Sequence, residues 1–182
     1  MNPEITKMLG YLETLGVNHS AHIDTRDIPF NPDFRKQCEQ NVCGNYQKNW
    51  MCPPNVGDFA ELKEKALQYK QAILFQTVHQ LEDSFDFEGM QEGMAEQNRI
   101  LRTFLGWIGE NNLITDFLSL GIGPCPVCSR CSILDGQECR LPEQAVASVE
   151  AYGIDVTSLV KHCGIPYNNG VNTVSYVSLV LF

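Results

Sequence analysis

The sequence of 182 residues lacks the features of several large classes of protein. Lys and Arg number 13 against 22 Asp and Glu, and the resulting net charge of −9 does not suit non-specific nucleic-acid binding, which needs a basic face. No apolar run approaches the ~18 residues of a membrane-spanning helix, and no secretory leader opens the chain. We therefore expect a cytoplasmic protein that binds neither nucleic acid nor membrane.

Familiar catalytic signatures are missing as well. The sequence contains no Gly-rich phosphate loop, no recognisable pairing of a nucleophile with its base, and no carboxylate pair at a recognisable spacing. The sequence alone therefore assigns no reaction.

Cysteine, by contrast, is plentiful, with eight residues. A single domain spanning residues 1–182 buries roughly 70% of its unfolded surface, so it needs no disulfide or metal merely to form a core. Thiols stay reduced in the cytoplasm, where clustered cysteines bind metal or perform redox chemistry more often than they form disulfides. The cysteines therefore call for a chemical explanation.

The densest cysteine group lies in the stretch G-P-C-P-V-C-S-R-C-S-I-L-D-G-Q-E-C-R-L-P, which contains Cys125, Cys128, Cys131 and Cys139. Thiolates in a C-x2-C-x2-C run can converge from one tight loop, as in proteins that hold [4Fe-4S] clusters. The spacing departs from the bacterial ferredoxin pattern, whose fourth cysteine follows after only three residues. Cys139 can therefore complete the same cluster or reach across to another.

A second group, Cys38, Cys43 and Cys52, ends in the context W-M-C-P-P. The Asn, Gly and Pro residues around these cysteines predict an irregular loop able to fold around an ion or cluster. The alternative is three reduced cysteines that act as small buried hydrophobes. We favour the metal-ligand role for these three cysteines, because residues in an irregular loop are rarely packed into the hydrophobic core.

The crowding of the late group bears on the kind of metal. Structural zinc usually takes pairs of ligands separated by a dozen or more residues, whereas three cysteines within seven residues favour a group with several iron corners. We expect an iron–sulfur cofactor, most simply a [4Fe-4S] cluster, with zinc as the alternative and no metal as the third case.

Three functions are compatible with such a site. The first is an electron carrier, in which an acidic chain holds one or two clusters and docks with a redox partner protein. The second is an enzyme in which the three-cysteine group leaves an open iron corner for a substrate. The third is a zinc-stabilised interaction module. Side chains near the cysteines that could serve a reaction, or equally pack, are Arg35, Tyr46, Trp50, Arg140 and Glu150.

Apolar periodicity predicts the remaining structure. Helices are expected at residues 3–15, 58–69, 87–109, 142–152 and 155–163, and strands at residues 17–23, 71–78, 115–120 and 172–182. The order of strand, cysteine loop, helix and strand occurs twice, with the helix of residues 87–109 between the copies. We therefore expect an α+β fold with two βαβ-like halves joined by a helix. Their four-stranded, ferredoxin-like sheet would carry helices packed on it and both cysteine loops at equivalent strand ends.

Several motifs together resemble a known family. They are C-x4-C-G-N-Y-x3-W-x-C-P-P, G-x-C-x2-C-x2-C-x7-C-R-x-P and S-V-E-A-Y-G-I-D-V. The chain resembles, from about residue 23 to its end, a prokaryotic family of predicted metal-binding, cysteine-rich proteins with a domain of unknown function. The resemblance implies an association with anaerobic organisms and ligand roles for the seven cysteines of the two groups. Cys163 lies outside the family's cysteine set and, with Leu159, on an apolar helix face, so we expect it to pack.

Overall fold

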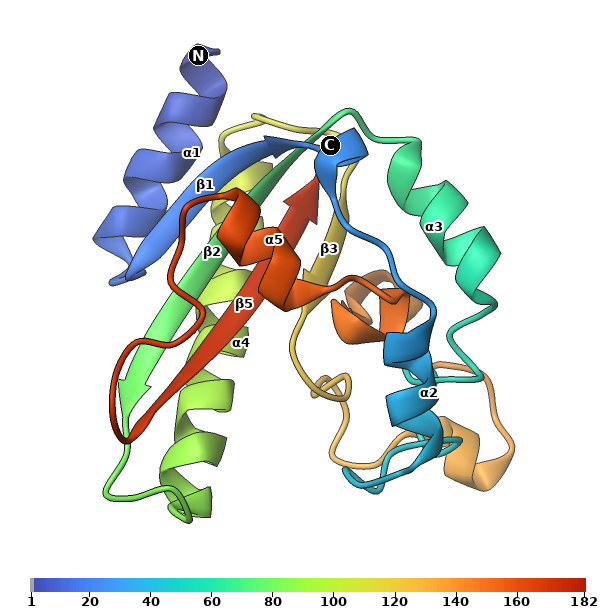
Figure 1. Cartoon of the computed structure of the whole chain (residues 1–182). Helices are drawn as coiled ribbons and strands as arrows, with labels where there is room; N and C mark the ends of the chain where they lie inside the picture. The colour runs from blue at the N-terminus through green and yellow to red at the C-terminus, as the bar shows by residue number, and fades with distance from the viewer. Residues whose placement is uncertain (1) are drawn as a thin grey trace.

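A five-stranded sheet runs through the computed structural model, which describes residues 2–182 (Figure 1). Its strands, in spatial order, are β1 (His19–Asp24), β2 (Gln71–Gln80), β5 (Thr173–Leu181), β3 (Leu118–Gly121) and β4 (Ala147–Ser148). Neighbouring strands are antiparallel except for β3 and β4, which are parallel. The sheet is therefore mixed, and the α+β class is confirmed.

Helices cover both faces of the sheet. They are α1 (Pro3–Thr14), α2 (Asp33–Glu39), α3 (Phe59–Leu67), α4 (Phe87–Glu110) and α5 (Val156–His162), with short 3-10 helices at Thr25–Asp27, Ser132–Asp135, Pro142–Gln144 and Glu150–Tyr152. The helices α1 and α4 pack on one face, whereas α3 and α5 pack on the other. No helix within residues 2–182 is both long and apolar enough to cross a membrane.

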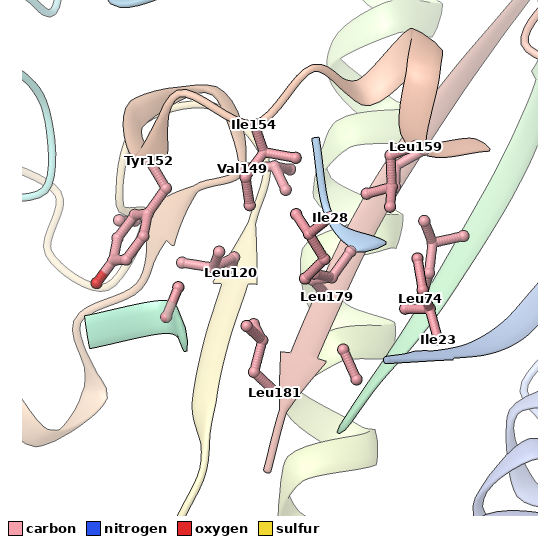
Figure 2. Close-up of a cluster of buried hydrophobic side chains, with 14 of the residues drawn as sticks. Ile23, Ile28, Leu74, Leu120, Val149, Tyr152, Ile154, Leu159, Leu179 and Leu181 are labelled. Atoms are coloured by element: carbon pink, nitrogen blue, oxygen red, sulfur yellow. The ribbon is translucent and has the colours of Figure 1, made fainter. Parts of the chain in front are cut away.

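Each face has its own core. Leu74, Leu120 and Leu179 meet Ile154 and Leu159 in the cluster on the α3 and α5 face (Figure 2). On the other face the side chains of β2 and β5 meet α1 and α4 at residues that include Ile73, Phe75, Phe104 and Val180. β2 is thus buried on both faces, as its continuous apolar run predicts.

Local signals explain most of the elements. Asn2 caps α1 by accepting a hydrogen bond from the Glu4 N–H at 2.9 Å, and Pro3 occupies the first helical turn. Asp155 caps α5 in the same way through the Ser158 N–H at 3.0 Å. Four of the five expected helices and all four expected strands are confirmed, with ends that differ by a few residues.

The helix expected at residues 142–152 is wrong. Two 3-10 helices flank the short strand β4 there, and β4 pairs Ala147 with Leu120 and Ser148 with Gly121 of β3. The apolar residues of this segment are therefore buried by pairing at the edge of the sheet and not by packing of one helical face. The sheet consequently has five strands instead of the expected four.

The two halves are also not βαβ units. A βαβ unit joins parallel strands, whereas β1 and β2 pair antiparallel, as do β3 and β5. Because β1, β2, β5 and β3 alternate in direction, β1 and β3 end at opposite ends of the sheet. Each cysteine loop follows the first strand of its half, as expected, but the two loops leave opposite ends of the sheet.

The two cysteine loops nevertheless meet, because residues 25–37 run back across the α3 and α5 face (Figure 1). This return segment is held by an isolated bridge between Phe30 and Ile154. The Asn31 N–H also donates to the Gly153 carbonyl oxygen at 2.7 Å, and the Asp155 N–H donates to that of Pro29 at 2.8 Å. The segment delivers α2, which carries Cys38 and was expected to be loop, to the end of the sheet where β3 stops.

Candidate metal centre

The four late cysteines surround one small cavity of about 20 Å³. Cys125, Cys128 and Cys131 come from the irregular loop after β3, and Cys139 follows the 3-10 helix Ser132–Asp135. All four are half-buried free thiols. Cys139 thus lies with its own run, whereas the sequence also allowed it to reach the other group.

The early loop closes this cavity from the opposite side. The Trp50 backbone N–H donates a hydrogen bond to the Cys131 Sγ at 3.4 Å, and its indole Nε1–H donates to the Gln137 carbonyl oxygen at 3.1 Å. Asn49, which is 7% exposed, donates through Nδ2 to the Cys125 carbonyl oxygen at 3.3 Å. An N–H group directed at a cysteine sulfur stabilises thiolate charge and tunes the potential of a bound cluster.

The early cysteines line a second, larger cavity of about 760 Å³. Cys38 lies in α2, Cys43 is exposed in the turn that follows, and Cys52 is half-buried just before Pro53. The opposite wall is built from α4, from the segment after β3, and from β5. Its residues include Met94, Ile122, Gly123, Ser175, Tyr176 and Val177.

Cys52 connects the two groups electrostatically. The pKa of its thiol is raised to about 12, first by burial and then by the nearby charges of Cys43, Cys38, Cys125 and Cys131 in that order. Thiols of both loops therefore lie near Cys52. At neutral pH the thiol is protonated, so a metal that binds it has to displace the proton.

Glu150 is the carboxylate of the larger cavity. It retains exposed surface because it faces this space, yet protein surrounds its carboxyl group closely enough to raise its pKa by desolvation. Hydrogen bonds from its own backbone N–H and from Ser148 oppose that shift. The pKa of the Cys38 thiol is raised too, first by burial and then by the charges of Cys43 and Glu150.

The other side chains considered from the sequence divide into two kinds. Tyr46 lines the larger cavity with Glu150. Arg35 instead donates to the Gly57 carbonyl oxygen at 2.7 Å, and Arg140 donates to that of Arg130 at 3.0 Å, so both tie loops together. Cys163 is half-buried against the α3 and α5 cluster and lines neither cavity.

Sequence reasoning missed several residues of the site. Met94 extends the apolar stripe of α4 and by that position is expected to fill the core, yet it is half-buried and lines the larger cavity beside Gly123. Asn49 was noted only as a loop residue, and the contribution of β5 to a cavity wall was not foreseen. The G-I-G-P segment was the available signal, since it ends β3 early and leaves room beside β5. Among residues 2–182, no three His, Cys, Asp or Glu side chains converge on one ion position.

Comparison with known proteins places this geometry in a family. Residues 21–182 match the family described as predicted metal-binding protein (DUF2284). The chain belongs to this family. No curated protein matches it significantly.

One solved structure shows a weak likeness. It is epoxyqueuosine reductase from Streptococcus thermophilus, with 11% sequence identity and a TM-score of 0.42. The match covers 100% of this chain and 46% of that protein, so the chain spans about half its length.

Proposed function

We propose that the chain is an iron–sulfur protein that transfers electrons in anaerobic redox metabolism, with a [4Fe-4S] cluster held by Cys125, Cys128, Cys131 and Cys139. The observation that supports this most is that all four cysteines line one cavity. At the same cavity the Trp50 N–H donates a hydrogen bond to the Cys131 Sγ. Such a cluster supplies reversible one-electron transfer. The chain's own residues hold the cluster, direct an N–H group at a ligand sulfur and limit the access of water.

The donor set fits a cluster better than a single ion. Zinc requires four ligands to converge tetrahedrally on one position, whereas a cubane takes each thiol at a separate iron corner. The four thiols are distributed around a cavity, which is the second arrangement. The cavity of about 20 Å³ has to widen for a cubane, and the irregular loop that carries three of the thiols can accommodate this change.

A second candidate function is supported by the larger cavity. Its volume of about 760 Å³ lies within the range of small-molecule sites. Cys38, Cys43 and Cys52 line it without a fourth cysteine. A cluster held by these three thiolates would have a corner free for a substrate, so the chain would then be an enzyme. A zinc-stabilised interaction module remains the alternative to both.

Metal analysis of variants tests the proposal. Protein purified without oxygen should be brown and contain iron and acid-labile sulfide, and Cys128→Ala should lose about one cluster's worth of iron. Cys163→Ala is the matched control, because Cys163 lies outside both cavities, and its iron content should equal that of the parent. Stoichiometric zinc without iron in the anaerobic protein would overturn the proposal.

The same measurement separates carrier from enzyme. If Cys43→Ala also removes one cluster while Cys163→Ala removes none, the early cluster has a ligand site that no cysteine fills, which supports the enzyme. If Cys163→Ala instead removes half of the iron, both clusters are fully thiolate-ligated, which supports the carrier.

A further inference from the structure

The strand β5 has a free edge beside the larger cavity. β3 pairs with β5 only from Leu118 opposite Leu181 to Leu120 opposite Leu179. The chain then turns away at Gly123, which adopts φ +62, and Pro124 has no N–H to continue a ladder. Within the described residues, the first half of β5 therefore has a strand partner on the β2 side alone.

The hydrogen-bond register identifies the groups on this free edge. Gln71 and Phe182 exchange two backbone hydrogen bonds, of 3.0 and 2.8 Å, so they form a hydrogen-bonded antiparallel pair. Such pairs recur every second residue, so Tyr176 and Ser178 direct their N–H and C=O groups toward β2. Ser175 and Val177 direct theirs away from β2, toward the free edge.

These outward groups lack partners in residues 2–182. No backbone or side-chain hydrogen bond joins the main-chain N–H or C=O of Ser175 or Val177 on that side. Val177 is only 5% exposed. Main-chain groups inside a protein are almost always paired, so the unpaired groups of half-buried Ser175 and buried Val177 are available to a ligand or bound water.

Both residues line the cavity of about 760 Å³, and the early cysteines lie on other parts of its wall. The polar side chains of the wall are mostly uncharged, such as Gln76, Ser148 and Tyr167. Glu150 is the carboxylate of this lining, and no Lys, Arg or His among the described residues contributes to it. The cavity thus offers hydrogen bonds without a cation to attract a phosphate or carboxylate.

We propose that the larger cavity binds a small, uncharged ligand with a peptide-like amide backbone, which pairs with Ser175 and Val177 as an added strand. Edge strands recognise extended peptides through main-chain hydrogen bonds, and the cavity volume limits the ligand to a short one. The bound amide would lie in the same cavity as Cys38, Cys43 and Cys52. This inference rests on the second candidate function, because it names the class of ligand for the cavity that the early cysteines line. The free edge of β5 does not itself depend on a bound metal.

Hydrogen–deuterium exchange at residue resolution tests the site on the full chain prepared without oxygen. In the free protein the amides of Ser175 and Val177 should exchange faster than that of Tyr176, which donates to β2. N-acetyl-trialanine amide, added at twice its dissociation constant, should slow the two edge amides about threefold, because exchange requires the unbound form. The matched control is the same peptide with N-methylated backbone amides. It has lost the N–H groups that would donate to the Ser175 and Val177 carbonyl oxygens, and its methyl groups block close approach of a strand, so it should protect the two amides far less.

Protection by both peptides alike, or by neither at the highest soluble concentration, would overturn the proposal. Val177→Pro removes one outward N–H at an edge position that tolerates proline and should abolish protection of Ser175. If this variant does not fold, the N-methylated peptide still decides. Iron analysis of the same sample separates the two proposals: protection without iron leaves only the amide site, and iron without protection leaves only the cluster.

Discussion

Cys52 is the residue on which the two cysteine groups meet. Its thiol is half-buried, and thiols of both loops lie close enough to raise its pKa. So many thiols in one place repel each other once ionised, and cations relieve that repulsion. The accumulation of cysteines around Cys52 is compatible with the proposal that both loops bind metal.

Tyr152 permits a test of burial at the level of a single residue. It is 3% exposed in the α3 and α5 cluster (Figure 2), where burial raises its pKa to about 12, with a smaller contribution from Tyr69. In the unfolded chain a tyrosine titrates near pH 10. The unfolded state therefore loses its proton first, and the stability that the neutral phenol confers is lost between about pH 10 and pH 12.

We expect Tyr152→Phe to remove this loss. Relative to the parent, the variant should gain about 1 kcal/mol in the free energy of unfolding between pH 8 and pH 11. Urea unfolding of both proteins at the two pH values measures the difference. A difference that does not change with pH would contradict the assigned burial of the phenol.

At the scale of elements, the chain repeats one arrangement of helix, strand, cysteine loop, helix and strand. The strands β1 and β3 are preceded by α1 and α4, which share one face. The strands β2 and β5, which lie between them, follow α3 and α5, which share the other face. The helix expected to join two halves, α4, thus occupies the place in the second half that α1 occupies in the first. A twofold relation of this kind sends the two cysteine loops to opposite ends of the sheet.

Gly153 contacts the return segment, residues 25–37, which brings the two cysteine loops back together. It adopts φ +69, and an added Cβ would lie 2.5 Å from the Phe59 ring and 3.2 Å from the Asn31 carbonyl oxygen. Gly164 has the same φ of +69 with nothing within 4 Å. The two glycines therefore share the backbone requirement and differ in the space available.

We expect Gly164→Ala to cost about 1 kcal/mol in the free energy of unfolding, from backbone strain alone. Gly153→Ala should cost about 1 to 3 kcal/mol more, because overpacking is added to that strain. Chemical denaturation of the two variants measures both values. Equal losses would show that the contact of Gly153 with Phe59 is not tight.

At the scale of the whole molecule, the excess of acidic residues gives the protein a net charge of −9. The ion pairs between its side chains are exposed and contribute little to stability. The field of the surplus acidic groups instead reaches about 8 Å into solvent at physiological salt and attracts basic molecules. If the chain is the proposed electron carrier, we expect its redox partner to present a basic surface.

The carrier function predicts a dependence on ionic strength. Electron transfer from the reduced protein to a basic haem protein should slow several-fold when the salt concentration rises from about 0.01 to 0.15 M, since the Debye length falls from about 30 to 8 Å. Stopped-flow measurements of the second-order rate constant test this, with an acidic acceptor as the control that should show the opposite trend. A rate independent of salt would count against steering by the acidic surface.

The sequence by itself determined the two cysteine groups, four of the helices and the strands β1, β2, β3 and β5, because caps, apolar periodicity and thiol spacing are local properties. It also carried the family resemblance. The seven candidate ligands remain predictions from the sequence, although the structure brings them to one end of the sheet.

Only the tertiary structure decided the rest. The pairing of β4 with β3, the opposite directions of β1 and β3, and the return of residues 25–37 arise from contacts between residues distant in sequence. The free edge of β5 is equally non-local, since it exists only because β3 departs at Gly123. Local propensity cannot encode these features, because the same residues form strands in antiparallel and in parallel pairs. Which pairing occurs depends on the path of the connecting segments.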